Sequence, residues 1–442
     1  MSRAVTSAAP SPPHGVTLPP APDLTLPWWV VPFRALRHRN YRLYFFGQLV
    51  SLTGSWVQTT ALMWLAYALT GQSRWPALIA AAQVLPTFIL GLLGGHLADH
   101  WPRRPLIFAT QAALLALAVL LGVLVLFFHV TAWDLLAIAL ACGVVNALDL
   151  PARLAFVMEM VGRDDLINAV ALNSVLFNVA RAAGPALGAW CLGFVGPGPC
   201  FLINGLSFVA VLAALALMTL PWRAAPSGHC AEKASLWAGF RYLAGRPTLV
   251  LLLVLTGALS LFGWPVLSLL PALADQHLHR SEGGYGSMLS ALGAGAMLAA
   301  LLVATFGSLG RSRLFLAAGV VLSAASLLCL SLAPSLPAAV ACCAGLGCGL
   351  VGFFATGQSV MQLSSRDHNR GRVMGVWSMV TSGGMPVGSL LAGWAADVWG
   401  VPQVVAWLGL GIAWAGGVVL LAGLAVRWLA FRRASVEGER GA

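Results

Sequence analysis

The stretch Gly94-Gly95-His96-Leu97-Ala98-Asp99-His100-Trp101-Pro102-Arg103-Arg104 joins two long runs without acidic or basic side chains other than histidine, 75–98 and 105–133. Each run is long enough to cross a bilayer as a helix. Because so few residues connect them, the two helices must lie antiparallel, and the paired glycines let their backbones approach closely where the connection begins. The stretch therefore predicts a charged hairpin between two membrane spans.

The composition of the whole chain also indicates a membrane protein. Of 442 residues, 59% are hydrophobic and only 9% are charged, and the mean hydropathy is +0.85. A soluble domain of this length carries far more charge. The formal net charge of +11 does not indicate a nucleic-acid partner, because the basic residues stand at the ends of apolar runs rather than on one soluble face. We expect an all-α protein embedded in a lipid bilayer.

Charge-free runs predict twelve transmembrane helices. Two long runs must each be divided at a strong turn signal, one at Gly196-Pro197-Gly198-Pro199 and one at Pro334-Ser335-Leu336-Pro337. The expected spans are 43–69, 75–98, 105–128, 132–151, 167–195, 199–220, 248–274, 283–306, 314–332, 336–363, 373–397 and 402–428.

Basic residues are distributed unequally between the two sides of this arrangement. Of 25 Lys and Arg residues, only Arg74 and Arg280 fall on the side opposite the N-terminus, and Arg181 falls within a span. Cytoplasmic loops carry the excess of Lys and Arg in membrane proteins. Both termini are therefore expected in the cytosol, and we expect the chain to work as a monomer.

Short internal repeats relate the two halves of the chain. Phe33-Arg-Ala-Leu36-x-x-Arg39 before the first span recurs as Phe240-Arg-Tyr-Leu243-x-x-Arg246 before the seventh. The halves are therefore expected to be two pseudo-symmetric six-helix bundles. The expected organisation is a disordered cytosolic tail at 1–32, an N-terminal bundle at 33–220, a cytosolic linker at 221–247, a C-terminal bundle at 248–430 and a cytosolic tail at 431–442.

The opening stretch carries one acid followed by a basic pair. On spacing alone, this pattern fits a functional loop and a positive-inside anchor with an incidental counter-charge equally well. The stretch nevertheless resembles the signature loop between the second and third helices of the major facilitator superfamily. Gly95, Leu97, Ala98, Asp99, Arg103 and Arg104 match that signature, whereas His100 and Pro102 stand where Arg and Gly are usual.

This resemblance implies a cytosolic latch in the outward-open state. Asp99, Arg103 and Asp149 would form it, since Asp149 ends the uncharged part of the fourth span. The alternative is that Asp149 meets only Arg153, four residues further along the same helix.

Arg181 is the one basic residue expected near the middle of a span, where an arginine costs about 2.5–3.5 kcal/mol on insertion scales. It either faces a hydrated cavity and meets a substrate, or is satisfied structurally by Asn178, Asn204 and free carbonyls. Gly184-Pro185 follows on the same helix and resembles an exporter motif of the superfamily, which implies a functional kink; the alternative is a simple packing kink.

Polar residues also recur on one face of the first span. A cavity wall explains this stripe better than hydrogen bonding between helices, and the second half offers weaker counterparts. The candidate substrate-cavity residues are Gln48, Ser51, Ser55, Gln58, Asn178, Arg181, Gln358, Gln362 and Ser382.

Longer motifs narrow the resemblance to the bacterial branch of the superfamily that includes the enterobactin exporter. They are Phe33 to Leu43, Asn146-Ala-x-x-x-Pro151-Ala-Arg153, Ala171 to Pro185 and Arg370-Gly-Arg-Val-Met374. This resemblance implies a secondary transporter of the inner membrane that exports a siderophore or amphipathic compound by proton antiport and alternating access. Peripheral carboxylates such as Asp149 or Asp134, or the substrate itself, would carry the protons.

Two other classes of function remain open at this stage. Uptake of a nutrient or lipid would use the same fold, and a membrane enzyme is disfavoured because no catalytic motif or pair of membrane acids is found. No cofactor, metal or nucleotide-binding loop is expected. The expected partners are therefore a small-molecule substrate, the proton gradient and the lipid bilayer.

Overall fold

The computed structural model describes residues 31–162, 164–219, 236–279, 282–307, 310–365 and 367–440. Most of the expected N-terminal tail and linker, at 1–30 and 220–235, lies outside these residues. The described residues form helices and connections, without a strand. Within the helices, some side chains are also not described, among them those of Asp99, Asn178 and Arg181.

The described residues of the first half form a short 3-10 helix and six long helices. Their ends coincide with the turn signals of the sequence, since Gly71, Gly162 and Gly196 adopt positive φ values directly after helices. The elements are η1 (Val31–Arg37), α1 (Arg39–Thr70), α2 (Arg74–His100), α3 (Arg103–Phe127), α4 (Ala132–Val161), α5 (Leu166–Val195) and α6 (Pro197–Ala216).

The described residues of the second half form nine helical elements. The elements are α7 (Leu236–Ala244), α8 (Pro247–Phe262), α9 (Val266–Ala272), the π-helix η2 (Leu273–His277), α10 (Glu282–Phe306), α11 (Ser312–Ser331), α12 (Leu336–Leu363), α13 (Asp367–Trp399) and α14 (Val401–Arg440). The connection between η2 and α10 is short and covers residues 278–281.

Two predicted spans are wrong in detail. The fourth was expected to end at Pro151, but α4 continues to Val161, because Phe156 and Val157 are buried in a core cluster that outweighs the backbone bond lost at the proline. The span expected at 248–274 is not one helix, since the chain breaks between α8 and α9. Pro265, which has no backbone N–H, stands at this break.

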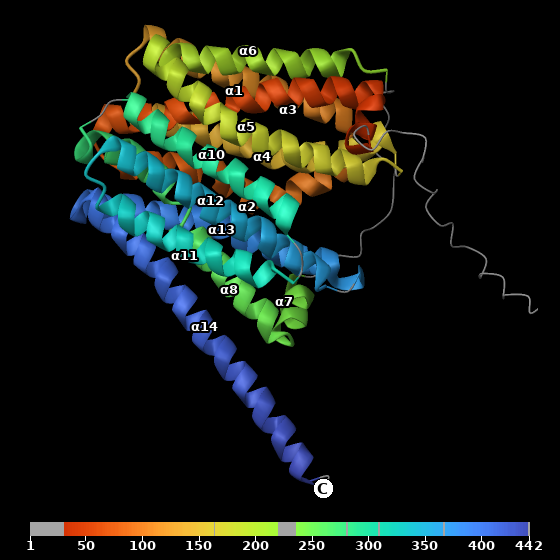
Figure 1. Cartoon of the computed structure of the whole chain (residues 1–442). Helices are drawn as coiled ribbons and strands as arrows, with labels where there is room; N and C mark the ends of the chain where they lie inside the picture. Colours follow the sequence, from red (N-terminus) through yellow and green to blue (C-terminus); the bar gives the residue numbers. More distant parts are fainter. Residues whose placement is uncertain are drawn as a thin grey trace, which may run out of the picture.

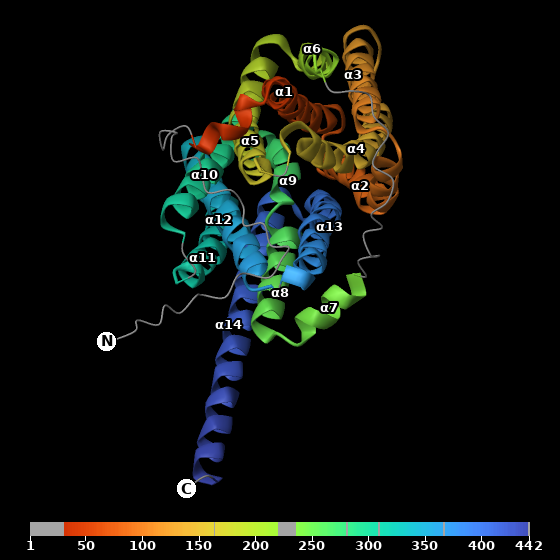
Figure 2. The ribbon, with the colours of Figure 1, turned by 90° about the vertical axis from the view of Figure 1, so that its right-hand side faces the viewer.

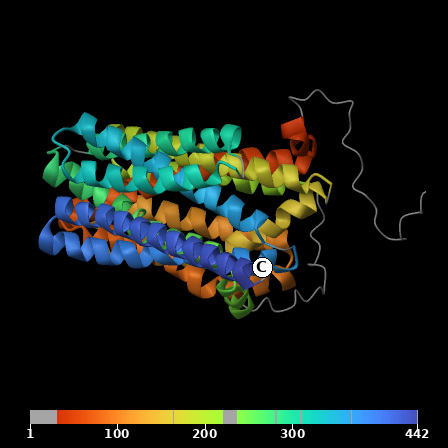
Figure 3. The same cartoon turned by 60° about the horizontal axis from the view of Figure 1, so that its bottom comes forward.

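The helices pack in two groups (Figures 1 and 2). Helices α1 to α6 contact one another, and α8 and α10 to α14 contact one another. The main contacts between the groups join α5 to α10 and α2 to α13. The far end of α14 extends beyond both groups (Figures 1 and 2) and comes toward the viewer in Figure 3. This helix includes the expected C-terminal tail as far as Arg440.

Among the described residues, eight helical segments are long and apolar enough to cross a membrane. They are α3, α4, α6, the segment from α8 to η2, α10, α11, α12 and α14. The other four expected spans correspond to α1, α2, α5 and α13. Three of these helices, α2, α5 and α13, take part in the main contacts between the groups. The fold class is confirmed as all-α, and the full count of twelve spans stays a prediction.

Candidate functional site

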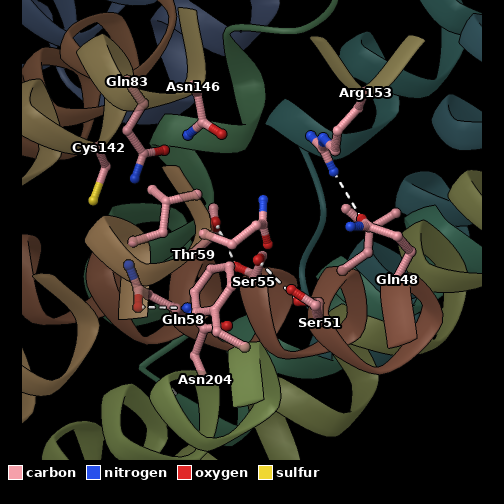
Figure 4. A pocket seen from close by; sticks show the side chains of 14 residues that line it. Gln48, Ser51, Ser55, Gln58, Thr59, Gln83, Cys142, Asn146, Arg153 and Asn204 are labelled. Atoms are coloured by element: carbon pink, nitrogen blue, oxygen red, sulfur yellow. Dashed lines mark hydrogen bonds between the residues drawn. The ribbon is translucent and has the colours of Figure 1, made fainter. Parts of the chain in front are cut away.

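A polar cavity lies inside the first group of helices, between α1 and α4, with α2, α3 and α6 around it (Figure 4). Its volume is about 160 Å³. Most of its lining is polar, although α3, α4 and α6 are long and apolar enough to cross a membrane. The lining residues are Gln48, Ser51, Leu52, Ser55, Gln58, Thr59, Gln83, Gln111, Leu114, Cys142, Asn146, Arg153, Asn204 and Phe208.

The α1 side of the cavity is a stripe at helical spacing. Ser55 donates a hydrogen bond to the carbonyl oxygen of Ser51 at 2.9 Å, and Thr59 donates to that of Ser55 at 2.9 Å. These hydroxyl protons are therefore used within the helix, which leaves the hydroxyl oxygens available as acceptors. The structure brings four sequence-predicted residues together here: Gln48, Ser51, Ser55 and Gln58.

The sequence reasoning missed the residues that complete the cavity from the other helices. Gln83, Gln111, Asn146 and Arg153 all line it. The signal was available, because polar residues inside apolar spans usually face a cavity or the bundle interior. The rotation of α2, α3 and α4 about their axes, which turns these side chains toward α1, could not be predicted from the sequence.

An ion pair lies at the edge of the cavity. Asp149, fully buried, has its Oδ2 atom 2.6 Å from Nε of Arg153. Thr110 donates to Asp149 Oδ1 at 2.7 Å, and Gln111 donates to Oδ2 at 3.0 Å. Arg153 in turn donates to Oε1 of Gln48 at 2.8 Å. This network links α1, α3 and α4.

The same network bears on the predicted latch. Asp149 makes the contact with Arg153 that was weighed as the alternative, and Arg103 pairs with Glu159 at 2.6 Å. The side chain of Asp99 lies outside those described. Since the latch was predicted for the outward-open state, it stays a prediction for that state.

Three of the remaining predicted residues do not line this cavity, and two lie outside the described side chains. Gln358 and Gln362 on α12 and Ser382 on α13 are exposed and do not line it. The side chains of Asn178 and Arg181 on α5 lie outside those described.

Gly184 and Pro185 lie inside the continuous helix α5. A Cβ atom at Gly184 would overlap the Cβ atom of Trp56, so this glycine permits the close packing of α5 on α1. The kink predicted there stays a prediction.

Two carboxylates of the second group bind the first group on the side where α1 ends and α2 begins. Asp397, near the end of α13, accepts hydrogen bonds from the backbone N–H of Ser73 at 2.6 Å and of Arg74 at 3.3 Å. Asp275, in η2, accepts one from the hydroxyl of Tyr67 at 2.9 Å. We call these bonds the inter-half contact.

Close packing surrounds the inter-half contact. The ring of Trp64 on α1 stacks on that of Tyr285 on α10, with centroids 6.0 Å apart and an interplanar angle of 18°. A Cβ atom at Gly393 would lie 2.5 Å from the Cβ atom of Ala77. The two groups therefore close against each other on this side with both polar and apolar contacts.

Two groups of long, mostly apolar helices, which contact each other closely on one side and enclose a polar cavity in the first group, are the arrangement of a secondary transporter fold. In the part of the chain that the structure describes, no cluster of His, Cys, Asp or Glu could hold a metal. The chain belongs to the transmembrane secretion effector family of major facilitator transporters, whose family model matches residues 30–434. The resemblance seen in the sequence is thus confirmed.

Several curated relatives cover most of the chain. The multidrug efflux pump Tap of Mycolicibacterium fortuitum is 25% identical, covering 81% of this chain and 90% of that protein. The enterobactin exporter EntS of Shigella flexneri is 25% identical, covering 83% and 87%. The staphyloferrin A transporter of Staphylococcus aureus is 21% identical, covering 84% and 92%. These relatives are transporters rather than enzymes, as the sequence predicted.

Solved structures show the same fold. A bacterial homologue of the human lysosomal transporter Spinster, in an inward-facing and occupied conformation, matches with a TM-score of 0.66 at 14% identity, covering 89% of this chain and 97% of that one. The nucleoside transporter NupG matches with a TM-score of 0.65 at 14% identity, covering 87% and 98%. The family match and the curated relatives show that the chain is a multi-pass membrane transporter with a small-molecule substrate.

Proposed function

We propose that this transporter exports an amphipathic small molecule, such as a siderophore or a drug-like compound, across the bacterial inner membrane by alternating access. The observation that carries the proposal is the polar cavity between α1 and α4, which offers hydrogen-bonding groups at membrane depth. The names of the relatives support export, since Tap is described as an efflux pump and EntS as an exporter.

We further propose that both termini lie in the cytosol. The side of the molecule that carries the α2–α3 hairpin then faces the cytosol, and the inter-half contact closes the opposite, periplasmic side. The bundles at 33–220 and 248–430 act as the two moving bodies, as a monomer. In this arrangement, export requires the bonds of Asp397 and Asp275 to break so that the cavity opens outward.

Proton antiport is the proposed energy source. Of the two carboxylates suggested by the sequence, Asp134 forms a capping box with Thr131 at the start of its own helix, where its Oδ2 atom accepts from the Thr131 backbone at 2.8 Å. Asp149 instead belongs to the network at the cavity. Its position next to the cavity makes Asp149 the better candidate for coupling proton movement to the substrate.

Arg181 is proposed to contribute to the same pathway from α5. Arg181→Met should abolish export at normal membrane abundance if the guanidinium contacts the substrate. Arg181→Lys keeps the charge but loses bidentate contact, so it should also reduce export. Wild-type export by Arg181→Met would assign this residue a structural role instead.

An accumulation assay tests the proposed function. Cells with and without the protein are loaded with a panel of siderophores, dyes and drugs, and intracellular concentrations are followed over time. We expect faster loss of at least one amphipathic compound from cells that contain the protein, and we expect collapse of the proton gradient to remove the difference. Persistence of export after collapse would refute proton antiport.

Direction and orientation are tested separately. Inverted membrane vesicles should accumulate the exported compound, whereas accumulation by intact cells would indicate uptake. Cysteines introduced at Gly198 and Ser335 should react with an impermeant reagent from outside, and one at Lys233 only from inside. The reverse pattern would overturn the proposed orientation.

A further inference from the structure

The ion pair at the edge of the cavity fixes the orientation of one glutamine on α1. A guanidinium group has only donors, so Arg153 can bind Gln48 only through the amide oxygen, at 2.8 Å. The amide nitrogen of Gln48 then takes the position on the amide that does not bind Arg153 (Figure 4). Gln48 is 3% exposed, and this nitrogen has no hydrogen-bond partner among the described residues.

Asp149, the other member of the ion pair, fixes the orientation of a second glutamine. Here the amide nitrogen is bound and the amide oxygen is left unpaired. Gln111 on α3 donates to Asp149 Oδ2 through its amide nitrogen at 3.0 Å, which is the only way it can bind an ionised carboxylate. Its amide oxygen is therefore left free. Gln111 is 1% exposed, and this oxygen has no partner within the described part of the chain.

Both glutamines line the same cavity, and each has one unpaired amide atom, a donor on Gln48 and an acceptor on Gln111. Both atoms are covered in this conformation, so an occupant contacts them once the cavity widens during alternating access. Buried polar atoms are normally hydrogen-bonded, and unpaired ones in a native structure often mark a functional site. An occupant that accepts from Gln48 and donates to Gln111 would satisfy both. A secondary amide or a hydroxyl group has this combination.

The charges at the cavity also limit which chemical groups can occupy it. Arg153 lies 2.6 Å from Asp149, so the two charges offset each other. An anionic group would find the arginine already paired and would lie close to the aspartate. The volume of about 160 Å³ is also smaller than the 300–1,000 Å³ of typical pockets for whole drug-sized ligands, so the cavity holds one part of a molecule.

From these observations, we infer that the cavity is a subsite for a neutral substrate group that both accepts and donates a hydrogen bond, an amide or a hydroxyl, with Gln48 as hydrogen-bond donor and Gln111 as acceptor. The inference rests on the proposed transport function and deepens it. It assigns to the Asp149–Arg153 pair the role of orienting the two amides rather than of contacting the substrate.

Binding of a matched set of probes to the purified full-length protein tests this subsite. The probes are N-butylbenzamide, butyl benzoate and 4-butylbenzoate, which offer the amide, an ester without a donor, and an anion. Calorimetric titration should give an affinity at least 10-fold higher for the amide than for either analogue, because a site built around hydrogen bonds discriminates strongly against a ligand that lacks one.

Variants identify the residues responsible. Gln48→Met and Gln111→Met should each reduce the amide preference to less than 3-fold, while Gln403→Met, at an exposed glutamine on α14, should keep it. If either cavity variant fails to fold, the comparison of probes on the wild-type protein still decides. Equal binding of amide and ester, or no binding of the amide, would overturn the subsite.

The accumulation assay separates failure of this inference from failure of the proposed function. Export without amide selectivity would leave the transporter proposal intact and remove the subsite. Selective amide binding without export of any compound would uphold the subsite and remove the proposed export.

Discussion

The carboxylate of Asp397 on α13 caps the first turn of α2, accepting from the backbone N–H of Ser73 at 2.6 Å. The first N–H groups of a helix have no partner within the helix, and here the partner comes from the other half of the molecule. Separation of the halves on this side therefore exposes a helix terminus as well as a carboxylate. The cap makes the start of α2 part of the closing mechanism.

We predict that Asp397→Ala shifts the protein toward opening on this side. Hydrogen bonds to charged groups contribute about 1.5–3 kcal/mol each, so loss of the cap should change the open-to-closed ratio roughly 10- to 150-fold. Spin labels at Phe194 and Ser335, in a background without reactive native cysteines, report the separation. Asp397→Asn keeps one acceptor and should have an intermediate effect.

Asp134→Asn is the matched control for this experiment. Asp134 lies on the same side but binds only Thr131 of its own helix start in the bonds that the structure describes. It should therefore leave the label distance unchanged. An unchanged distance in Asp397→Ala as well would show that the cap does not hold the halves together.

The bond between Tyr67 and Asp275 should contribute less than the cap. Tyr67→Phe removes one hydroxyl donor at 2.9 Å from the carboxylate while keeping the packed ring. We expect a shift of about 1.5 kcal/mol toward the open state, at the lower end of the range for bonds to charged groups. Comparison of the double variant Tyr67→Phe, Asp275→Asn with the two single variants gives the interaction energy between these residues. Strict additivity of the two single effects would mean that the residues do not stabilise closure through each other.

Much of this architecture was predictable from the sequence because membrane helices are marked by uninterrupted apolar runs. The expected hairpin at Asp99 matches the turn between α2 and α3, which end and begin at His100 and Arg103. The polar stripe of α1 was also visible, since residues at helical spacing share a face whatever lies opposite.

The partners of polar residues were harder to predict. Asp149 had two plausible arginine partners, and the choice depends on how α3 is turned relative to α4. The i,i+4 contact with Arg153 needs no such information. Gln111 and Gln83 were missed for the same reason, because a single polar residue in an apolar span does not show which neighbour it faces. The break between α8 and α9 likewise depends on tertiary packing.

The buried ion pair should be sensitive to removal of one partner. Asp149→Asn leaves the Arg153 guanidinium without its counter-charge, and breaking a buried pair in this way costs about 3–5 kcal/mol. We expect a lower melting temperature in detergent and reduced membrane abundance. The double variant Asp149→Asn, Arg153→Gln removes both charges and should recover most of the stability.

Failure of the double variant to recover stability would argue that Asp149 is needed for its bonds to Thr110 and Gln111 rather than for charge balance. Those bonds are 2.7 Å and 3.0 Å long. Thr110→Val then distinguishes the two cases, since it removes one of these bonds without changing any charge.

Arg104 is predicted to stabilise the first bundle by capping α6. Its Nε and Nη2 atoms donate to the carbonyl oxygen of Leu215 at 3.0 and 2.6 Å, and Nη2 also donates to that of Ala216 at 3.3 Å, where α6 ends. Carbonyls in the last turn of a helix have no partner within the helix, and a cation is favourable there. Arg104→Met should therefore destabilise the protein by about 2–3 kcal/mol.

The neighbouring arginine provides the comparison. Arg103 pairs with Glu159, whose side chain is 37% exposed, and pairs of this kind contribute about 0.2–1 kcal/mol. Thermal unfolding in detergent should thus show a clearly larger loss for Arg104→Met than for Arg103→Met. Equal losses would mean that the two arginines act through their positive charge at the membrane surface, and that the contacts of Arg104 with the end of α6 contribute nothing specific.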